Sequence, residues 1–132
     1  MAAVPQPWQR MWDAFEAMAL EDAVDLVDPG VEWETRWPGM EGVYRGVDGL
    51  RQYLANLREA LAPDPPALLD ARELDANRVL LHYRVSGRGA GSGVEVSMEF
   101  WDIWTRRGDR LARRQVFYSR DEALAAAFEL EG

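Results

Sequence analysis

The sequence predicts an α+β domain in which helices pack on one face of an antiparallel sheet. Three observations predict this class. Apolar residues recur at helical spacing in the first half of the chain, four strand-like segments follow one another in the second half, and short turns join these segments. Because short connections link antiparallel neighbours, the four segments are expected to pair in sequence order.

Three helices are expected before the strands and one after them. Residues 8–19 carry apolar side chains at the spacing of one helix face. These are Trp8, Met11, Trp12, Phe15 and Met18. A shorter helix is expected over 21–27, and a longer one from Asp48 to residue 61. Ser119 and Glu122 form a capping box that predicts a last helix, ending near residue 129.

The strands are recognised by alternation. In the stretch VEWETRW, residues 31–37, Val31, Trp33, Thr35 and Trp37 share one side, and Glu32, Glu34 and Arg36 share the other. The turn Asp28-Pro29-Gly30 is expected to precede this strand and Pro38-Gly39 to end it. The later strands are expected over 67–75, 78–86, 94–105 and 110–118.

Length and composition limit the possible functions. The 132 residues have the size of one domain, so we expect a single domain over 1–132 with residues 1–7 as a flexible N-terminal segment. The net charge of −8 argues against a nucleic-acid surface, which needs a basic patch. No apolar run is long enough for a membrane span, no signal peptide is recognised, and the absence of cysteine fits a cytoplasmic protein.

Two further features of the composition bear on a site. Six tryptophans are several times the usual share, and large rings can either fill a small core or line an apolar cavity. With no cysteine and a single histidine, His82, we expect no transition-metal site and no cofactor. Alternation places His82 on the outer face of the sheet.

Four strings, in this order and spacing, resemble the SnoaL-like branch of the nuclear transport factor 2-like superfamily. They are EDAVDLVDPGVEW, GVYRGVDGLRQYL, VLLHYRVSGRGAGSGVEV and DIWTRRGDRLARRQVFYSRDEALAA, which together span nearly all of residues 12–127. The resemblance implies a cone of curved sheet closed by helices. Because the superfamily holds isomerases, cyclases, epoxide hydrolases and non-catalytic binding domains, it implies no single activity.

The resemblance to ketosteroid isomerases implies positions for a proton-transfer set. Their base, an acidic residue near the end of the first strand, falls on Glu34. Their acid partner on the long strand falls on Trp101, and their phenol on the first helix falls near Trp12 or Asp13. The set is therefore incomplete. The two aspartates of the epoxide hydrolases are not matched either, and no cyclase residue can be placed.

The same register implies the lining of a cavity. Its residues would be Leu81, Tyr83 and Val85 on one strand, Glu99, Trp101 and Ile103 on the next, and Arg114, Val116 and Tyr118 on the last. We expect Glu34 and Arg114 to be the candidate catalytic residues, because a buried carboxylate can act as a base and an arginine can bind an oxyanion. The candidate ligand-binding residues are Tyr83, Glu99, Trp101, Tyr118 and Trp12.

Three functions remain open. The leading one is a protein that binds a small, largely apolar ligand in an internal cavity. The alternatives are an acid–base enzyme that uses Glu34 and a non-catalytic dimeric interaction module. A homodimer is expected through the outer face of the sheet, where the long strand would place an apolar row. That row consists of Val94, Val96, Met98, Phe100 and Trp104.

Overall fold

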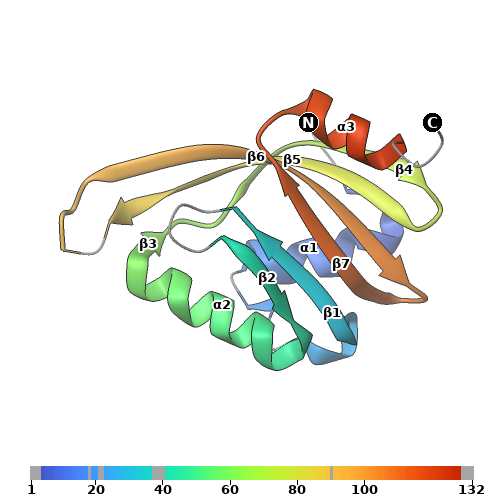
Figure 1. Ribbon diagram of the computed structural model, residues 1–132, viewed down its shortest axis with the longest axis horizontal. Helices are drawn as coiled ribbons and strands as arrows, with labels where there is room; N and C mark the ends of the chain where they lie inside the picture. The colour runs from blue at the N-terminus through green and yellow to red at the C-terminus, as the bar shows by residue number, and fades with distance from the viewer. Residues whose placement is uncertain (1–3, 18, 21–22, 37–40, 90, 129–132) are drawn as a thin grey trace.

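The computed structural model describes residues 4–17, 19–20, 23–36, 41–89 and 91–128 (Figure 1). In chain order the elements are η1 (Gln6–Trp8), α1 (Gln9–Glu16), η3 (Val24–Leu26), β1 (Val27–Thr35), β2 (Gly42–Arg45), α2 (Gly46–Ala60), β3 (Leu61–Pro63), β4 (Ala67–Asp75), β5 (Arg78–Gly89), β6 (Glu95–Arg107), β7 (Arg110–Phe117) and α3 (Arg120–Phe128). Among the described residues, no helix is long and apolar enough to cross a membrane. The predicted α+β class is confirmed.

One seven-stranded sheet organises the chain. Its order is β2-β1-β7-β6-β5-β3, with β4 also paired to β5. The four strands predicted in the second half pair antiparallel in sequence order. The expectation of an antiparallel sheet is corrected at one place, because β1 and β7 are parallel. The two short edge strands β2 and β3 were not predicted, since three or four residues give too little alternation to recognise.

The first strand begins earlier than its alternation predicts. The residues Asp28-Pro29-Gly30, expected to precede the strand, belong to β1, and the pairing with β7 shifts register between Val27 and Glu32. Pro29 has no backbone N–H to donate to a neighbouring strand. Strands tolerate proline at such irregular points of the ladder. The predicted helix over 21–27 reduces to the 3₁₀ turn η3 within the described residues. Trp37 and Pro38-Gly39 lie outside them.

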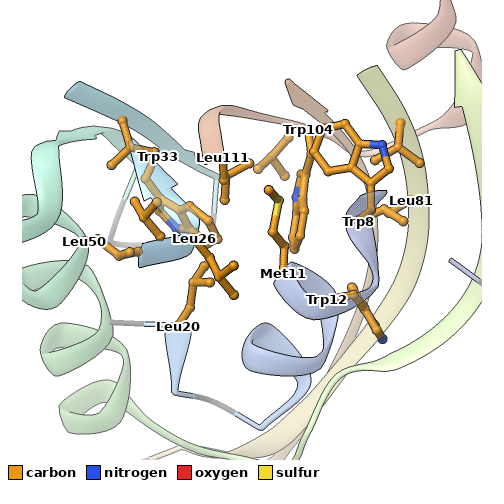
Figure 2. Packing of buried hydrophobic residues seen from close by; sticks show 14 of the residues in the cluster. Trp8, Met11, Trp12, Leu20, Leu26, Trp33, Leu50, Leu81, Trp104 and Leu111 are labelled. Atoms are coloured by element: carbon orange, nitrogen blue, oxygen red, sulfur yellow. The ribbon is translucent and has the colours of Figure 1, made fainter. Parts of the chain in front are cut away.

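The concave side of the sheet and the helices α1 and α2 enclose the larger core. Figure 2 shows how side chains from α1, α2 and the strands meet there, with Trp33 of β1 and Trp104 of β6 among them. The helix faces predicted from sequence are confirmed, since Trp12 of α1 and Leu57 of α2 are buried against the sheet. Val4, which belongs to the segment expected to be flexible, is buried and packs on this core, whereas Gln6 is exposed.

A smaller core lies on the opposite, convex side, under α3 (Figure 1). Ala123 of α3 is fully buried there against Leu80, Ile103 and Phe117 from three neighbouring strands. The predicted capping residues are in place, because the backbone N–H of Glu122 donates to the Ser119 hydroxyl at 3.2 Å. The C-terminal helix therefore covers part of the face on which the homodimer was expected.

The apolar row of the long strand lies on the concave side and not on the outer face. Phe100 is 3 % exposed and Trp104 is fully buried in the larger core, and Val96 and Met98 pack against the same core. The expected outer patch is thus wrong. The physical reason is simple, since the largest apolar rings of a strand face the core when one side of the sheet is covered by helices.

Candidate functional site

A pocket opens into the larger core between α2 and the concave side of the sheet. Its walls are mostly apolar, and its lining is contributed by α1, α2, strands β1, β5, β6 and β7, and the connections between elements. The lining residues are Phe15, Leu20, Trp33, Thr35, Arg36, Tyr53, Leu54, Leu57, Asp64, Pro66, Tyr83, Val85, Phe100, Arg114 and Val116. Ligand sites in proteins have this character, with apolar walls and a few placed polar groups.

A buried polar cluster supports one wall of this pocket, to which it contributes Tyr83 and Arg114. Arg114 of β7 donates from Nε to Asp102 Oδ2 at 2.7 Å, and the Tyr83 hydroxyl donates to the same oxygen at 2.8 Å. Arg114 Nη2 donates to the Tyr83 oxygen at 2.6 Å, and the indole N–H of Trp104 donates to Asp102 Oδ2 at 3.0 Å. The three strands β5, β6 and β7 are adjacent, so their inward side chains at these positions meet by register.

Burial sets the electrostatics of the cluster. The side chains of Arg114 and Asp102 are 4 % and 0 % exposed. Burial raises the pKa of the Asp102 carboxyl, and the Arg114 charge opposes that rise. Burial also raises the pKa of the Tyr83 phenol well above its usual value, with Arg114 again opposing. Tyr83 is therefore a neutral hydrogen-bond donor to Asp102 at ordinary pH.

Arg114 is fixed in one orientation. Besides its bonds to Asp102 and Tyr83, its Nη1 donates to the Glu34 carbonyl oxygen at 2.9 Å. Its guanidinium also stacks over the Trp33 ring, with Cζ 4.5 Å from the ring centroid. A guanidinium held by several bonds and an aromatic face is preorganised, so little freedom is lost when it binds a further acceptor.

The space in the pocket is limited in this conformation. The cavity itself has a volume of about 40 Å³. All the empty space between the lining residues, including the open mouth and its solvent, is about 630 Å³. The smaller volume holds roughly three waters, if one water needs about 10–15 Å³. A ring-sized ligand would therefore occupy the open part of the pocket or displace a lining side chain.

Glu34 does not face the pocket. Alternation along β1 buries Val31, Trp33 and Thr35 on the concave side, whereas Glu34 lies on the other face with Glu32. Its Oε2 accepts a hydrogen bond from the Val116 backbone N–H at 2.8 Å. The expected inward direction of Glu34 is therefore wrong, and with it the expected pairing of Glu34 and Arg114 on one face. Apolar Val31 and Trp33 occupy the core side because burying them is favourable and burying a glutamate is not.

Glu99 and Trp101 also lie on the outer face, contrary to expectation. Glu99 accepts from His82 Nε2 at 2.8 Å and from Arg84 at 3.3 Å, and these contacts lower its pKa. Trp101 stacks on the His82 ring at 4.1 Å. His82 is on the outer face as predicted. The whole parity of β6 is the reverse of the one implied by the resemblance.

Of the other candidates, two line the pocket as expected, whereas Trp12 and Tyr118 are not among its lining residues. Arg114 and Tyr83 line the pocket. Trp12 is buried beside Tyr83, with ring centroids 5.8 Å apart, behind the lining formed by Phe15. Tyr118 is 42 % exposed beside Phe100, and its hydroxyl donates to the Arg36 carbonyl oxygen.

Asp102 is the residue that the sequence analysis missed. It lies one position beyond Trp101, the position matched to the acid partner of the isomerases, and it is fully buried. The signal was present in the sequence, because Asp102 shares its parity with Phe100 and Trp104. A single carboxylate on an otherwise apolar strand face predicts a buried acid with a dedicated partner. Within the described residues, no group of His, Asp and Glu side chains is arranged to hold a metal ion.

The SnoaL-like domain family matches residues 8–114. This chain belongs to the SnoaL-like family. No curated protein matches the chain. Its fold is similar to that of TerC, co-crystallized with polyporic acid, with 19% identity, 94% of this chain and 96% of that chain covered and a TM-score of 0.72.

Two other solved structures extend this likeness. An NTF2-like protein of unknown function from Burkholderia pseudomallei has 15% identity, coverage of 90% of this chain and 92% of that one, and a TM-score of 0.73. A protein with a ketosteroid isomerase-like fold from Catenulispora acidiphila, in complex with trimethylamine, has 15% identity, coverage of 93% and 92%, and a TM-score of 0.69. At these identities the likeness establishes the fold alone.

Proposed function

We propose that this SnoaL-like protein binds a small, largely apolar molecule in the pocket between α2 and the sheet. The observation that carries the proposal is the pairing of aromatic walls with one fixed polar wall, made by Tyr83 and Arg114 and held from behind by the buried Asp102. Apolar walls supply the affinity through burial, and the polar wall orients the ligand. Two of the structurally similar proteins were solved with small molecules, which supports the proposal by analogy.

A matched pair of variants tests the pocket. Val85 lines the pocket, so Val85→Trp fills it, whereas Val43 is 47% exposed on β2 and Val43→Trp adds the same ring at the surface. We expect 1-acetonaphthone to bind the wild type saturably in calorimetric titrations. Val85→Trp should weaken this binding at least about tenfold, which corresponds to about 1.4 kcal/mol, and Val43→Trp should leave it unchanged. Equal binding by both variants would place the ligand elsewhere.

The second candidate is proton transfer next to a carbonyl group. The buried contact between Tyr83 and Asp102 favours it, and Glu34 does not enter, because it lies on the other face. In such a step the substrate C–H proton moves to the Tyr83 oxygen while Tyr83 passes its proton to Asp102, and the electron pair moves to the carbonyl oxygen. NMR of 1-acetonaphthone in D₂O measures this exchange at the methyl group. If Tyr83→Phe leaves the exchange rate unchanged, Tyr83 and Asp102 do not carry out this proton transfer.

The homodimer expected through the outer face of the sheet is proposed on that same face, but through other residues than the apolar row. Because the apolar row of β6 is internal, the outer face offers Glu99 with Arg84, and Trp101 stacked on His82. A two-fold axis there can place Glu99 of one copy against the partner's Arg84. Sedimentation should give twice the chain mass for the wild type and a monomer for Glu99→Arg. A monomeric wild type would contradict the dimer.

A further inference from the structure

We propose that the Tyr53 hydroxyl, together with Arg114, binds the oxygen of a neutral carbonyl compound in the pocket. The inference rests on the proposed ligand-binding function and names the chemical class of the ligand. Tyr53 is on α2, so it approaches the pocket from the side opposite Arg114 and Tyr83 on the sheet. The family resemblance implied no role for Tyr53.

The Tyr53 hydroxyl is a polar group for which no described residue supplies a hydrogen-bond partner. The residue is 6% exposed and lines the pocket, and no other described residue forms a hydrogen bond with its hydroxyl. By contrast, the neighbouring Tyr44 hydroxyl accepts from Asn56 at 3.3 Å. The oxygen atom itself stays accessible, since it is not one of the fully buried polar atoms that lack a partner. An accessible donor in a mostly apolar pocket is available to a ligand, and such placed polar groups orient ligands in pockets of this kind.

Arg114 offers the second donor. An arginine has five N–H groups. Three of them are used by Asp102, Tyr83 and the Glu34 carbonyl, which leaves two without a partner among the described residues. The Arg114 Cζ is 6.0 Å from the Tyr53 ring centroid, and the Trp33 ring contacts both side chains, with its centroid 5.8 Å from that of Tyr53. One ligand oxygen above Trp33 can accept from both groups.

The charge around this position selects a neutral oxygen. The Arg114 charge is matched by Asp102, which is fully buried with it. A carboxylate on the ligand would add an uncompensated charge in a mostly apolar pocket, and such a charge is costly to desolvate. The protein's net charge of −8 also disfavours an anion at a distance. A ketone, ester or quinone oxygen accepts hydrogen bonds without this penalty.

Three probes and two variants test the inference. The probes are 1-acetonaphthone, which has a carbonyl, 1-ethylnaphthalene, which has the same body without the oxygen, and 1-naphthoate, which is an anion. The wild type should bind 1-acetonaphthone more tightly than either of the others. Tyr53→Phe should reduce the preference over 1-ethylnaphthalene about threefold to tenfold, the range of one hydrogen bond. Tyr44→Phe, the matched control, should leave it unchanged.

Each outcome has a distinct meaning. Equal binding of 1-acetonaphthone and 1-ethylnaphthalene, or an unchanged preference in Tyr53→Phe, would overturn the role of Tyr53 and leave the apolar pocket standing. Tighter binding of 1-naphthoate would overturn the neutral-carbonyl class. If none of the probes binds, the proposed ligand-binding function fails together with this inference. Thermal unfolding of both variants should show that they remain folded.

Discussion

Removal of the Arg114 side-chain charge should be one of the most damaging single changes in the sheet. Arg114→Met leaves Asp102 fully buried without its cation and removes the bonds to Tyr83 and the Glu34 carbonyl. Breaking a buried ion pair from one side costs about 3–5 kcal/mol. That is a large part of the roughly 5–15 kcal/mol that stabilises a domain. Urea unfolding measures the loss.

The control is the adjacent residue of the same strand. Arg113 is exposed on the other face of β7, so Arg113→Met should change the free energy of unfolding by no more than about 0.5 kcal/mol. A double-mutant cycle with Asp102→Asn isolates the pair. The double variant should be more stable than the sum of the single losses predicts. Additive losses, or equal effects of Arg113→Met and Arg114→Met, would refute the buried pair.

The pH dependence of Arg114→Met provides an independent check. Burial raises the pKa of Asp102, and without Arg114 nothing of like size opposes it. A carboxyl whose pKa is raised by folding binds its proton more tightly in the folded state, so stability falls as pH rises above the unfolded value of about 3.9, until the folded pKa is passed. The stability deficit of Arg114→Met should therefore be smaller near about pH 4 than near about pH 7. A deficit that is constant over this range would contradict the assignment.

Three further predictions concern neighbouring groups. Leu57→Ala should lower the free energy of unfolding in urea titrations by on the order of 2–5 kcal/mol, and Phe15→Ala should lower it less because Phe15 is half-buried. Unchanged unfolding midpoints would mean that these helix faces do not close the core. Because the Tyr83 pKa is raised far above its usual value, Tyr83→Phe should not reduce the tyrosinate absorbance of the folded protein at about pH 11; a reduced signal would mean that Tyr83 ionises in the fold. Glu34→Gln should leave 1-acetonaphthone binding unchanged, since Glu34 contacts the Val116 backbone on the face away from the pocket, and a large loss of affinity would return Glu34 to the site.

The sequence was sufficient for the fold and for the positions of Tyr83 and Arg114 at the pocket. Alternation in VEWETRW separates Trp33 from Glu34 correctly, but alternation alone does not say which side faces the core. The side was taken from the register of the resemblance, and at Glu34 it conflicted with the preference of large apolar residues for burial. On β6 the same register placed Trp101 inward, so the buried Asp102 next to it was not recognised.

Arg114 lies on the expected side because β7 pairs regularly with β6 from Arg113 to Phe117. Before this stretch the register shifts between Thr105 and Arg106, so Leu111 also reaches the concave side although its spacing from Arg114 is odd. A bulge of this kind leaves no clear mark in the run RLARR. The role of Tyr53 could not be read from its helix face, since a tyrosine at helical spacing is expected to be core. Its missing hydrogen-bond partner becomes visible only in three dimensions.

The most direct test of the central claim follows the tryptophan indole N–H signals by NMR during titration with 1-acetonaphthone. Trp33 lies in the pocket wall, and its indole N–H is buried without a partner among the described residues. Trp101 lies on the outer face, stacked on His82. We predict that the Trp33 signal, assigned with Trp33→Phe, shifts saturably while the Trp101 signal stays in place. A shift of Trp101 without Trp33, or no shift of either, would contradict ligand binding in this pocket.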